Sequence, residues 1–158
     1  SLDWSLLTGR GIHEQIAASH AIMGLDTQLV LDGTYFVVEC EGRIAGCGGW
    51  SRRATLYGGD HSASSRNPAL LDPSCDPARV RAMYTHPDFV RQGVANMILA
   101  LCEKAAAADG YKRAQLMATM SGLALYQVNG YRALEHTGAD ANGTNIPLVR
   151  MEKSLSAP

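Results

Sequence analysis

The feature that most constrains this chain is a strand, a turn and a long helix in direct succession, followed by another strand. Residues 78–85 include Val, Tyr and Thr and predict a strand. Apolar residues recur at helical spacing over 92–109, and Gly110 is the expected C-terminal cap of this helix. Residues 112–118 predict the next strand. Because a strand–helix–strand crossover joins parallel strands, we expect one parallel pair in the sheet.

The segment before this crossover predicts helices and then a hairpin. Apolar spacing over 11–23 and a short apolar run at 29–31 indicate two helices. Residues 34–40 and 43–50 read as strands, and only two residues separate them, so we expect an antiparallel hairpin. The glycines of its second strand indicate a β-bulge or a close approach of backbone.

The C-terminal part predicts a short helix over 121–128 and two strands over 131–137 and 146–153. Together the elements predict an α/β fold with a mixed, mostly antiparallel central sheet, one strand–helix–strand crossover and flanking helices. We expect residues 1–158 to form a single domain, because no linker composition divides them. The Gly-, Ser- and Pro-rich segment 52–77 predicts a long loop within it.

Composition and charge argue against several classes of protein. The chain has 158 residues, 46% of them apolar, with a formal net charge of −1, whereas nucleic-acid-binding domains are usually basic. No apolar run approaches the roughly 18 residues of a membrane span. The four cysteines and five histidines lack the spacing of metal ligands. We therefore expect a cytoplasmic protein with reduced, mostly buried thiols, no metal, no nucleic-acid partner and no membrane contact.

The junction between the central strand and the long helix predicts an anion-binding site. The first backbone N–H groups of a helix have no partner within it and lie at the positive end of its dipole. Gly93 and Ala95 leave room for a pyrophosphate against this backbone. Residues 79–158 carry a net charge of +3, against −4 for residues 1–78, which also favours an anion here. Neither a P-loop nor the glycine fingerprint of nicotinamide-dinucleotide folds is present, which disfavours an oxidoreductase.

Three motifs, in the correct order, resemble the GNAT superfamily of N-acetyltransferases. R-Q-G-V-A at 91–95 is similar to the family's Q/R-x-x-G-x-G/A turn, although Val90 stands where Gln or Arg is usual. L-Y-Q-V-N-G-Y at 125–131 is similar to F/L-Y-x-x-x-G-F/Y, and E-C-E-G-R-I-A-G at 39–46 to an E-x-D/E-G-x-I-x-G hairpin. The resemblance covers roughly residues 34–153.

One departure from the family concerns its first strand, which precedes the first helices and which we do not find before Gly11. The sequence predicts that this strand is missing or very degenerate. Residues 35–40 would then present an unpaired apolar edge. We expect this edge to be covered by residues 1–10 folded back or by a second protomer, and a homodimer is the more economical cover.

The resemblance implies acetyl-CoA as the donor. Backbone N–H groups of the turn would hold the pyrophosphate, and the strand edge would hydrogen-bond the pantetheine arm. The N–H of Met83 would polarise the thioester carbonyl. Thr119 or Ser121 would take the place of an Asn that the family has ahead of its last helix. The candidate donor-binding residues are Met83, Tyr84, Thr85, Arg91, Gln92, Gly93, Val94, Ala95, Asn96, Thr119 and Ser121.

The resemblance assigns catalysis to Tyr126, whose hydroxyl would protonate or hydrogen-bond the departing sulfur of CoA. A core tyrosine bonded to the backbone is the alternative. The general base stays open between Glu39, His86, Glu135 and water.

The sequence therefore predicts transfer of an acetyl group from acetyl-CoA to an amine by direct attack. The acceptor is expected to be a small molecule or a peptide. Arg79 and Arg81, two residues apart on one strand, would with Arg52 and Arg53 favour an acceptor that bears a carboxylate, unless they are solvated surface charges. A non-catalytic module that binds acyl-CoA as a sensor is the alternative function.

Overall fold

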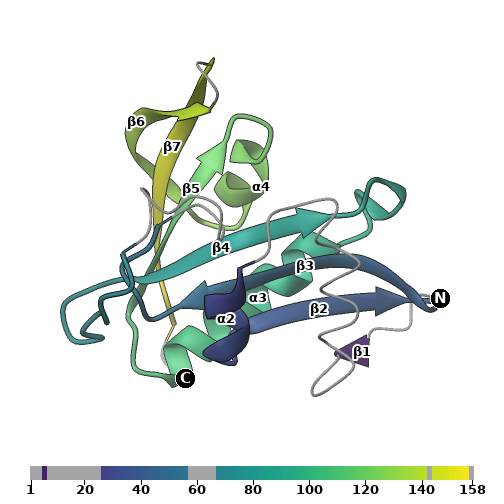
Figure 1. Cartoon of the computed structure of the whole chain (residues 1–158), viewed down its shortest axis with the longest axis horizontal. Coiled ribbons are helices and arrows are strands. Elements are labelled where there is room, and N and C mark those ends of the chain that lie inside the picture. Colours follow the sequence, from purple (N-terminus) through teal and green to yellow (C-terminus); the bar gives the residue numbers. More distant parts are fainter. Residues whose placement is uncertain (1–4, 7–25, 57–66, 142–143, 157–158) are drawn as a thin grey trace.

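The computed structural model describes residues 5–6, 26–56, 67–141 and 144–156. The helix predicted over 11–23 lies outside these ranges, as does the middle of the predicted loop. The described strands form one seven-stranded sheet in the order β1-β2-β3-β4-β5-β7-β6 (Figure 1). They are β1 (Ser5–Leu6), β2 (Tyr35–Cys40), β3 (Arg43–Ser51), β4 (Ala78–Thr85), β5 (Arg113–Thr119), β6 (Arg132–Ala141) and β7 (Thr144–Ser154).

The described helices lie on both faces of this sheet (Figure 1). They are α2 (Thr27–Leu31), α3 (Val94–Ala108), α4 (Leu123–Val128) and the 3-10 turn η2 (Pro87–Phe89). Neighbouring strands are antiparallel except β4 and β5, which are parallel and are connected through α3. The predicted mixed, mostly antiparallel α/β sheet with one crossover is confirmed.

The main core lies between α3 and the sheet. Ile98 and Leu99 of α3 are fully buried there, as the apolar face of this helix predicts. A smaller cluster on the opposite face contains Val37 and Cys47, against which Val30 of α2 packs. The four cysteines are free and three of them are buried.

The predicted hairpin of β2 and β3 is present, and its turn has the conformation that two-residue hairpin loops require. Glu41 and Gly42 both have positive φ, 51° and 75°. Paired positive φ values match the right-handed twist of the flanking strands.

Of the two alternatives predicted for the first strand, absence is wrong and the very degenerate strand is present. β1 pairs with β2 through Ser5↔Glu39 and Leu6↔Val38, so residues of the N-terminal segment fold back onto this edge. Two residues are too few to show an alternating pattern, which is why the sequence gives no sign of the strand. The homodimer stays a prediction.

The glycines of β3 allow β3, β4 and α3 to pack closely, as predicted. A Cβ on Gly46 would lie 2.6 Å from Val94 Cγ1, and one on Gly48 would collide with Met83 Sδ. The start of α3 and the second half of β4 are therefore held against the sheet at positions where no side chain fits.

Candidate active site

The sheet opens between its two parallel strands. β4 and β5 pair only at Ala78↔Ala114 and Arg79↔Gln115, and then they run apart (Figure 1). β5 stays paired with β7 as far as Thr119. Within the described part of the chain, the later residues of β4 therefore have no ladder partner on the β5 side, and their backbone groups are available to an extended ligand.

A β-bulge lies within this half of β4. Arg81 pairs with Gly49 and Tyr84 with Cys47, so Ala82 and Met83 together oppose Gly48. Ala82 has a positive φ of 59°, which is rare for a residue with a side chain. The bulge breaks the ladder to β3 beside the opening, at the position of a predicted donor-binding residue, Met83.

Consecutive side chains of β4 lie on opposite faces of the sheet. Met83 packs against the core that contains α3, and Tyr84 packs against the smaller cluster beneath α2. The predicted residues Met83, Tyr84 and Thr85 therefore lie along the opening, with Thr85 at the end of the strand.

The N-terminus of α3 presents uncapped backbone amides next to this opening. Gly93 has a φ of 84°, and no side chain caps the helix. The first intrahelical bond runs from the Met97 N–H to the Gly93 carbonyl, so the N–H groups of Val94, Ala95 and Asn96 have no acceptor among the described residues. A Cβ on Gly93 would meet nothing within 4 Å. This is the geometry expected of an anion cradle.

Contacts that sequence reasoning missed hold the turn before α3. Arg43 of β3 forms an ion pair of 2.6 Å with Asp88 and lies 4.9 Å from the centre of the Phe89 ring. The hydrogen bond from Arg43 lowers the pKa of Asp88. Gln92 Nε2 donates to the Asp88 carbonyl at 3.3 Å, while Arg91 is exposed with a positive φ of 61°.

Tyr126 lies in α4 with only 8% of its surface exposed. Its ring packs edge-on against Tyr131, at 5.9 Å between ring centres. The hydroxyl makes no hydrogen bond to any described residue, so the alternative of a backbone-bonded core tyrosine has no support here. Burial, chiefly, raises the pKa of Tyr126 to about 12, so the phenol keeps its proton at neutral pH.

Thr119 and Ser121 lie where β5 turns into α4. Their hydroxyl oxygens are 3.1 Å apart, and the Gly122 N–H donates to the Thr119 carbonyl at 3.1 Å. These two predicted residues are exposed and lie on the β5 side of the opening, opposite β4.

The structure does not bring the three candidate bases together. Glu39 is on β2, two strands away from β4 in the sheet order. His86 Nδ1 accepts the Asp88 N–H at 3.1 Å and caps η2, which is a structural role. Glu135 of β6 pairs with Arg150 at 3.2 Å.

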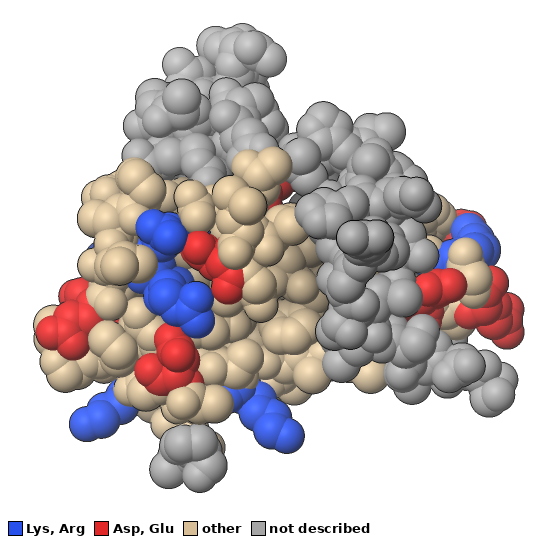
Figure 2. All heavy atoms as spheres, turned by 60° about the horizontal axis from the view of Figure 1, so that its bottom comes forward, with Lys and Arg blue, Asp and Glu red and all other residues tan. Residues whose placement is uncertain are grey.

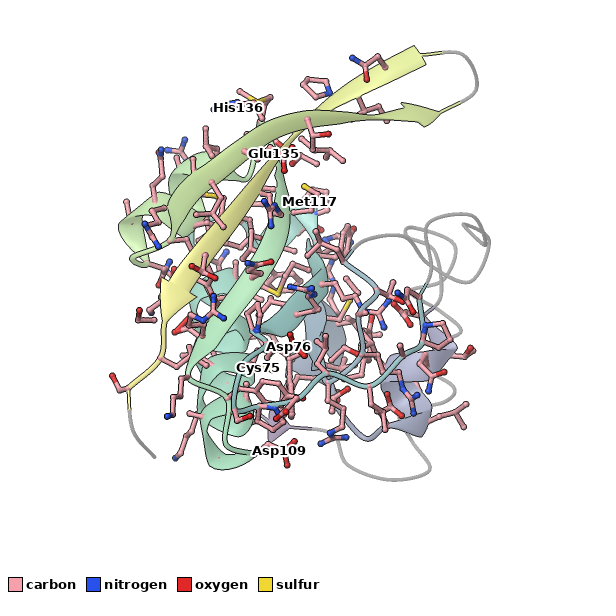
Figure 3. All side chains as sticks on the ribbon, turned by 90° about the vertical axis from the view of Figure 1, so that its left-hand side faces the viewer. Cys75, Asp76, Asp109, Met117, Glu135 and His136 are labelled. Atoms are coloured by element: carbon pink, nitrogen blue, oxygen red, sulfur yellow. The ribbon has the colours of Figure 1, made fainter. Side chains whose placement is uncertain are left out.

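Glu135 lies on the face of the sheet opposite α3, and its strand β6 is two strands away from β5 in the sheet order. Glu135 pairs with Arg150 of β7, and Arg150 in turn pairs with Met117 of β5, so these three side chains share one face of the sheet. Figure 3 shows Glu135 and Met117 on that side, with His136 on the other side of β6.

The four arginines predicted to attract a carboxylate have different environments. Three form ion pairs with carboxylates of the chain itself. The pairs are Arg52–Asp109 at 3.1 Å, Arg53–Asp32 at 2.8 Å and Arg81–Asp26 at 2.8 Å. Arg79 instead donates to Gln115 Oε1 at 2.7 Å. Three of the four are therefore already neutralised, which the sequence alone did not show.

A hollow lies elsewhere on the surface, and none of the residues that line it belongs to β4 or β5. It is lined by Ala100, Glu103, Lys104, Ala107, Lys153, Leu155 and Ser156. Lys153 and Glu103 pair there at 2.6 Å. Basic and acidic side chains also lie next to each other on the face in Figure 2.

Among the residues the structure describes, no cluster suits a metal ion, and no helix is long and apolar enough to cross a membrane.

The parting of β4 from β5, with a long helix beginning at the end of β4, defines an acetyltransferase-like fold. Residues 31–133 match the family model described as an acetyltransferase (GNAT) domain. This match spans more than half of the chain, and the protein therefore belongs to the GNAT acetyltransferase family. No curated protein sequence matches it.

Solved structures with the same fold cover nearly the whole chain. The ribosomal-protein-S18-alanine N-acetyltransferase of Escherichia coli has a TM-score of 0.66 at 12% identity, over 99% of this chain and 96% of that one. The ribosomal-protein-alanine N-acetyltransferase of Brucella melitensis has 0.68 at 14%, over 96% and 99%. Naa20 of Chaetomium thermophilum, in complex with a bisubstrate analogue, has 0.68 at 17%, over 96% and 86%. At these identities the likeness concerns the fold.

Proposed function

We propose that this protein transfers an acetyl group from acetyl-CoA to an amine by direct attack. The observation that carries the proposal is the opening between β4 and β5, with the uncapped N-terminus of α3 at its end. The opening offers backbone groups to an extended chain, and the helix offers amides to a pyrophosphate. Acetyl-CoA combines these two chemistries in one molecule.

In this proposal the donor lies along β4. The backbone N–H groups from Gln92 to Asn96 hold the pyrophosphate, with Arg91 as the nearest cation of the turn. The backbone of Met83 to Thr85 hydrogen-bonds the pantetheine arm, and the N–H of Met83 faces the thioester carbonyl. Thr119 and Ser121 offer hydroxyl groups from the β5 side.

The chemistry follows from this placement. An uncharged amine nitrogen attacks the thioester carbon, a C–N bond forms, and the C–S bond breaks. The departing thiolate is hydrogen-bonded or protonated by Tyr126, whose raised pKa keeps the phenol protonated at neutral pH. A phenolate formed in this way regains its proton from solvent, which receives the proton released by the attacking nitrogen. The nitrogen loses its own proton to Glu39, to Glu135 or to water, because His86 caps η2 and lies in a structural position.

The acceptor is an amine of a small molecule or a peptide. Two of the similar structures are named ribosomal-protein-alanine N-acetyltransferases, which makes a peptide α-amine the first acceptor to test. The test incubates the protein with acetyl-CoA and a panel of peptide and small-molecule amines, and mass spectrometry follows acetylated products and free CoA. Acetylated amine supports the proposal. Tight CoA binding with no product from any amine would contradict it and favour the sensor.

A further inference from the structure

Two of the nine arginines in the described ranges form no ion pair with a carboxylate of those ranges. The seven that do are Arg43, Arg52, Arg53, Arg81, Arg113, Arg132 and Arg150. The other two are Arg91 and Arg79. Arg91 is exposed on the turn before α3, beside the amides that would hold an anion. Arg79 is half-buried on β4 and lies far along the strand from that turn, so it calls for a separate explanation.

The guanidinium of Arg79 is held in place but not neutralised. Its Nη1 donates to Gln115 Oε1 at 2.7 Å, and the Gln115 amide is oriented by its own bond to Glu152 Oε1 at 3.0 Å. The Nε atom of Arg79 is buried, and no described residue accepts its hydrogen. Leaving a buried donor on a charged group unsatisfied is costly, and a neutral side chain would avoid this cost.

Charges of both signs surround Arg79. Burial lowers the pKa of Arg79 most; the charges of Arg150 and Arg113 add to this effect, while the carboxylates of Asp76 and Glu152 oppose it. A guanidinium nevertheless stays charged in a protein. No carboxylate of the described residues forms an ion pair with this charge, which leaves the guanidinium able to pair with a carboxylate from outside the chain.

Arg79 is also at a significant place in the sheet. Arg79↔Gln115 is the last pair of β4 and β5 before these strands part. Ala78 and Val80, its neighbours on β4, are buried in the core beneath α3, so Arg79 lies on the opposite face. Gln115 and Met117 of β5 alternate with core residues in the same way, and Figure 3 shows Met117 facing that side.

We propose that Arg79 binds a carboxylate of the acceptor, so that the acceptor is an amine with an anionic group remote from the reacting nitrogen. This inference rests on the proposed function. Met83 is four residue steps along β4 from Arg79, roughly 13 Å of extended strand, which the bulge shortens. A free α-amino acid carries both groups on one carbon and is too short. An acidic residue near the start of a peptide, or an ω-amino carboxylate, has the required reach.

The test compares acceptors that differ only in this charge. Two short peptides with the same free α-amine carry Glu or Gln at the second and third positions. The wild-type protein is expected to have a kcat/KM about ten- to a hundredfold higher for the Glu peptide, as for a hydrogen bond between charged groups. Arg79→Gln should bring the two values together without changing the KM for acetyl-CoA. Arg132→Gln is the matched control, because Arg132 is 75% exposed and touches the same network only through Glu152.

Each remaining outcome has a clear reading. Equal kcat/KM values in the wild-type protein for the Glu peptide, the Gln peptide and an ω-amino carboxylate would overturn the inference. A preference for the Glu peptide that survives in Arg79→Gln would also overturn it. If Arg79→Gln does not fold, Arg79→Lys keeps the charge without the fork and should retain part of the preference. If no amine is acetylated, the proposed function fails. Calorimetry with the N-acetylated Glu and Gln peptides, in the presence of CoA, then decides the inference independently, since only the Glu peptide should bind and only when Arg79 is present.

Discussion

Asn129 donates a hydrogen bond of 2.8 Å to Asn96 Oδ1 and so joins the end of α4 to the first turn of α3. The same amide group also donates to the Leu125 carbonyl at 2.8 Å. The helix that carries Tyr126 is thereby tied to the amides proposed to bind pyrophosphate. The two halves of the site, the proton donor and the phosphate cradle, are positioned by one side chain that touches neither reacting group.

Asn129→Ala should reduce catalysis while leaving the donor site intact. The loss of these bonds, each worth about 1 kcal/mol, should lower kcat about three- to tenfold with little change in the Kd for CoA. Steady-state kinetics and calorimetry measure the two quantities. Gln127→Ala, on the exposed surface of the same helix, should behave like the wild type. An unchanged kcat in Asn129→Ala would show that the link does not position Tyr126.

Gly93→Glu should abolish most CoA binding while the fold survives. A Cβ here meets no described atom within 4 Å, and the carboxylate of a Glu would lie where the pyrophosphate is proposed. We expect calorimetry to show a Kd for CoA at least about tenfold higher, since like charges meet at a helix N-terminus. Gly110→Ala is the control for backbone strain, because Gly110 has a similar φ of 96° at the other end of α3. Equal losses in both variants would locate the phosphate elsewhere.

Tyr126→Phe should lower kcat by roughly ten- to a thousandfold, the range of general acid catalysis, with the Kd for CoA almost unchanged. Because burial raises the pKa of Tyr126 to about 12, the wild-type rate should show no loss from its deprotonation between pH 7 and about pH 10. Tyr131→Phe is the control: it removes a bond to Glu103 and should affect stability instead. A wild-type kcat in Tyr126→Phe would assign this residue to packing.

The ion pair of Asp32 and Arg53 should make stability fall in acid. The hydrogen bonds from Arg53, at 2.8 and 3.0 Å, lower the pKa of Asp32 in the folded protein. This contribution is complete above the unfolded pKa of about 3.8 and is lost as the pH falls through the lower folded value. Urea unfolding between pH 2 and 6 should therefore show a smaller loss in Asp32→Asn than in the wild type. Identical pH profiles would mean that the pair contributes nothing.

The parts of the fold that were predictable depend on local sequence. A two-residue turn defines the hairpin, and helical spacing followed by Gly110 defines α3. The small residues Gly93 and Ala95 mark the cradle for the same reason, because the free amides at a helix start follow from the helix itself.

The parts that were not predictable depend on which residues meet across the sheet. The two-residue β1 has no pattern of its own, and only its pairing with β2 reveals it. Arg79 and Arg81 lie two residues apart on the same strand and look alike in the sequence. In the structure, Arg81 forms an ion pair with Asp26, whereas Arg79 donates a hydrogen bond to Gln115. Register and the path of the chain decide such partners, so the sequence could not separate an arginine that forms an ion pair from one that forms none within the described part of the chain.

The central claim is that the donor binds where β4 parts from β5 and α3 begins. Backbone amide chemical shifts of isotope-labelled protein, recorded during titration with CoA, test it most directly. We predict that the largest changes occur at Val94, Ala95 and Met83. Largest changes instead at the residues around Glu103 and Lys153, which line the separate hollow, or no saturable change at all, would contradict the account.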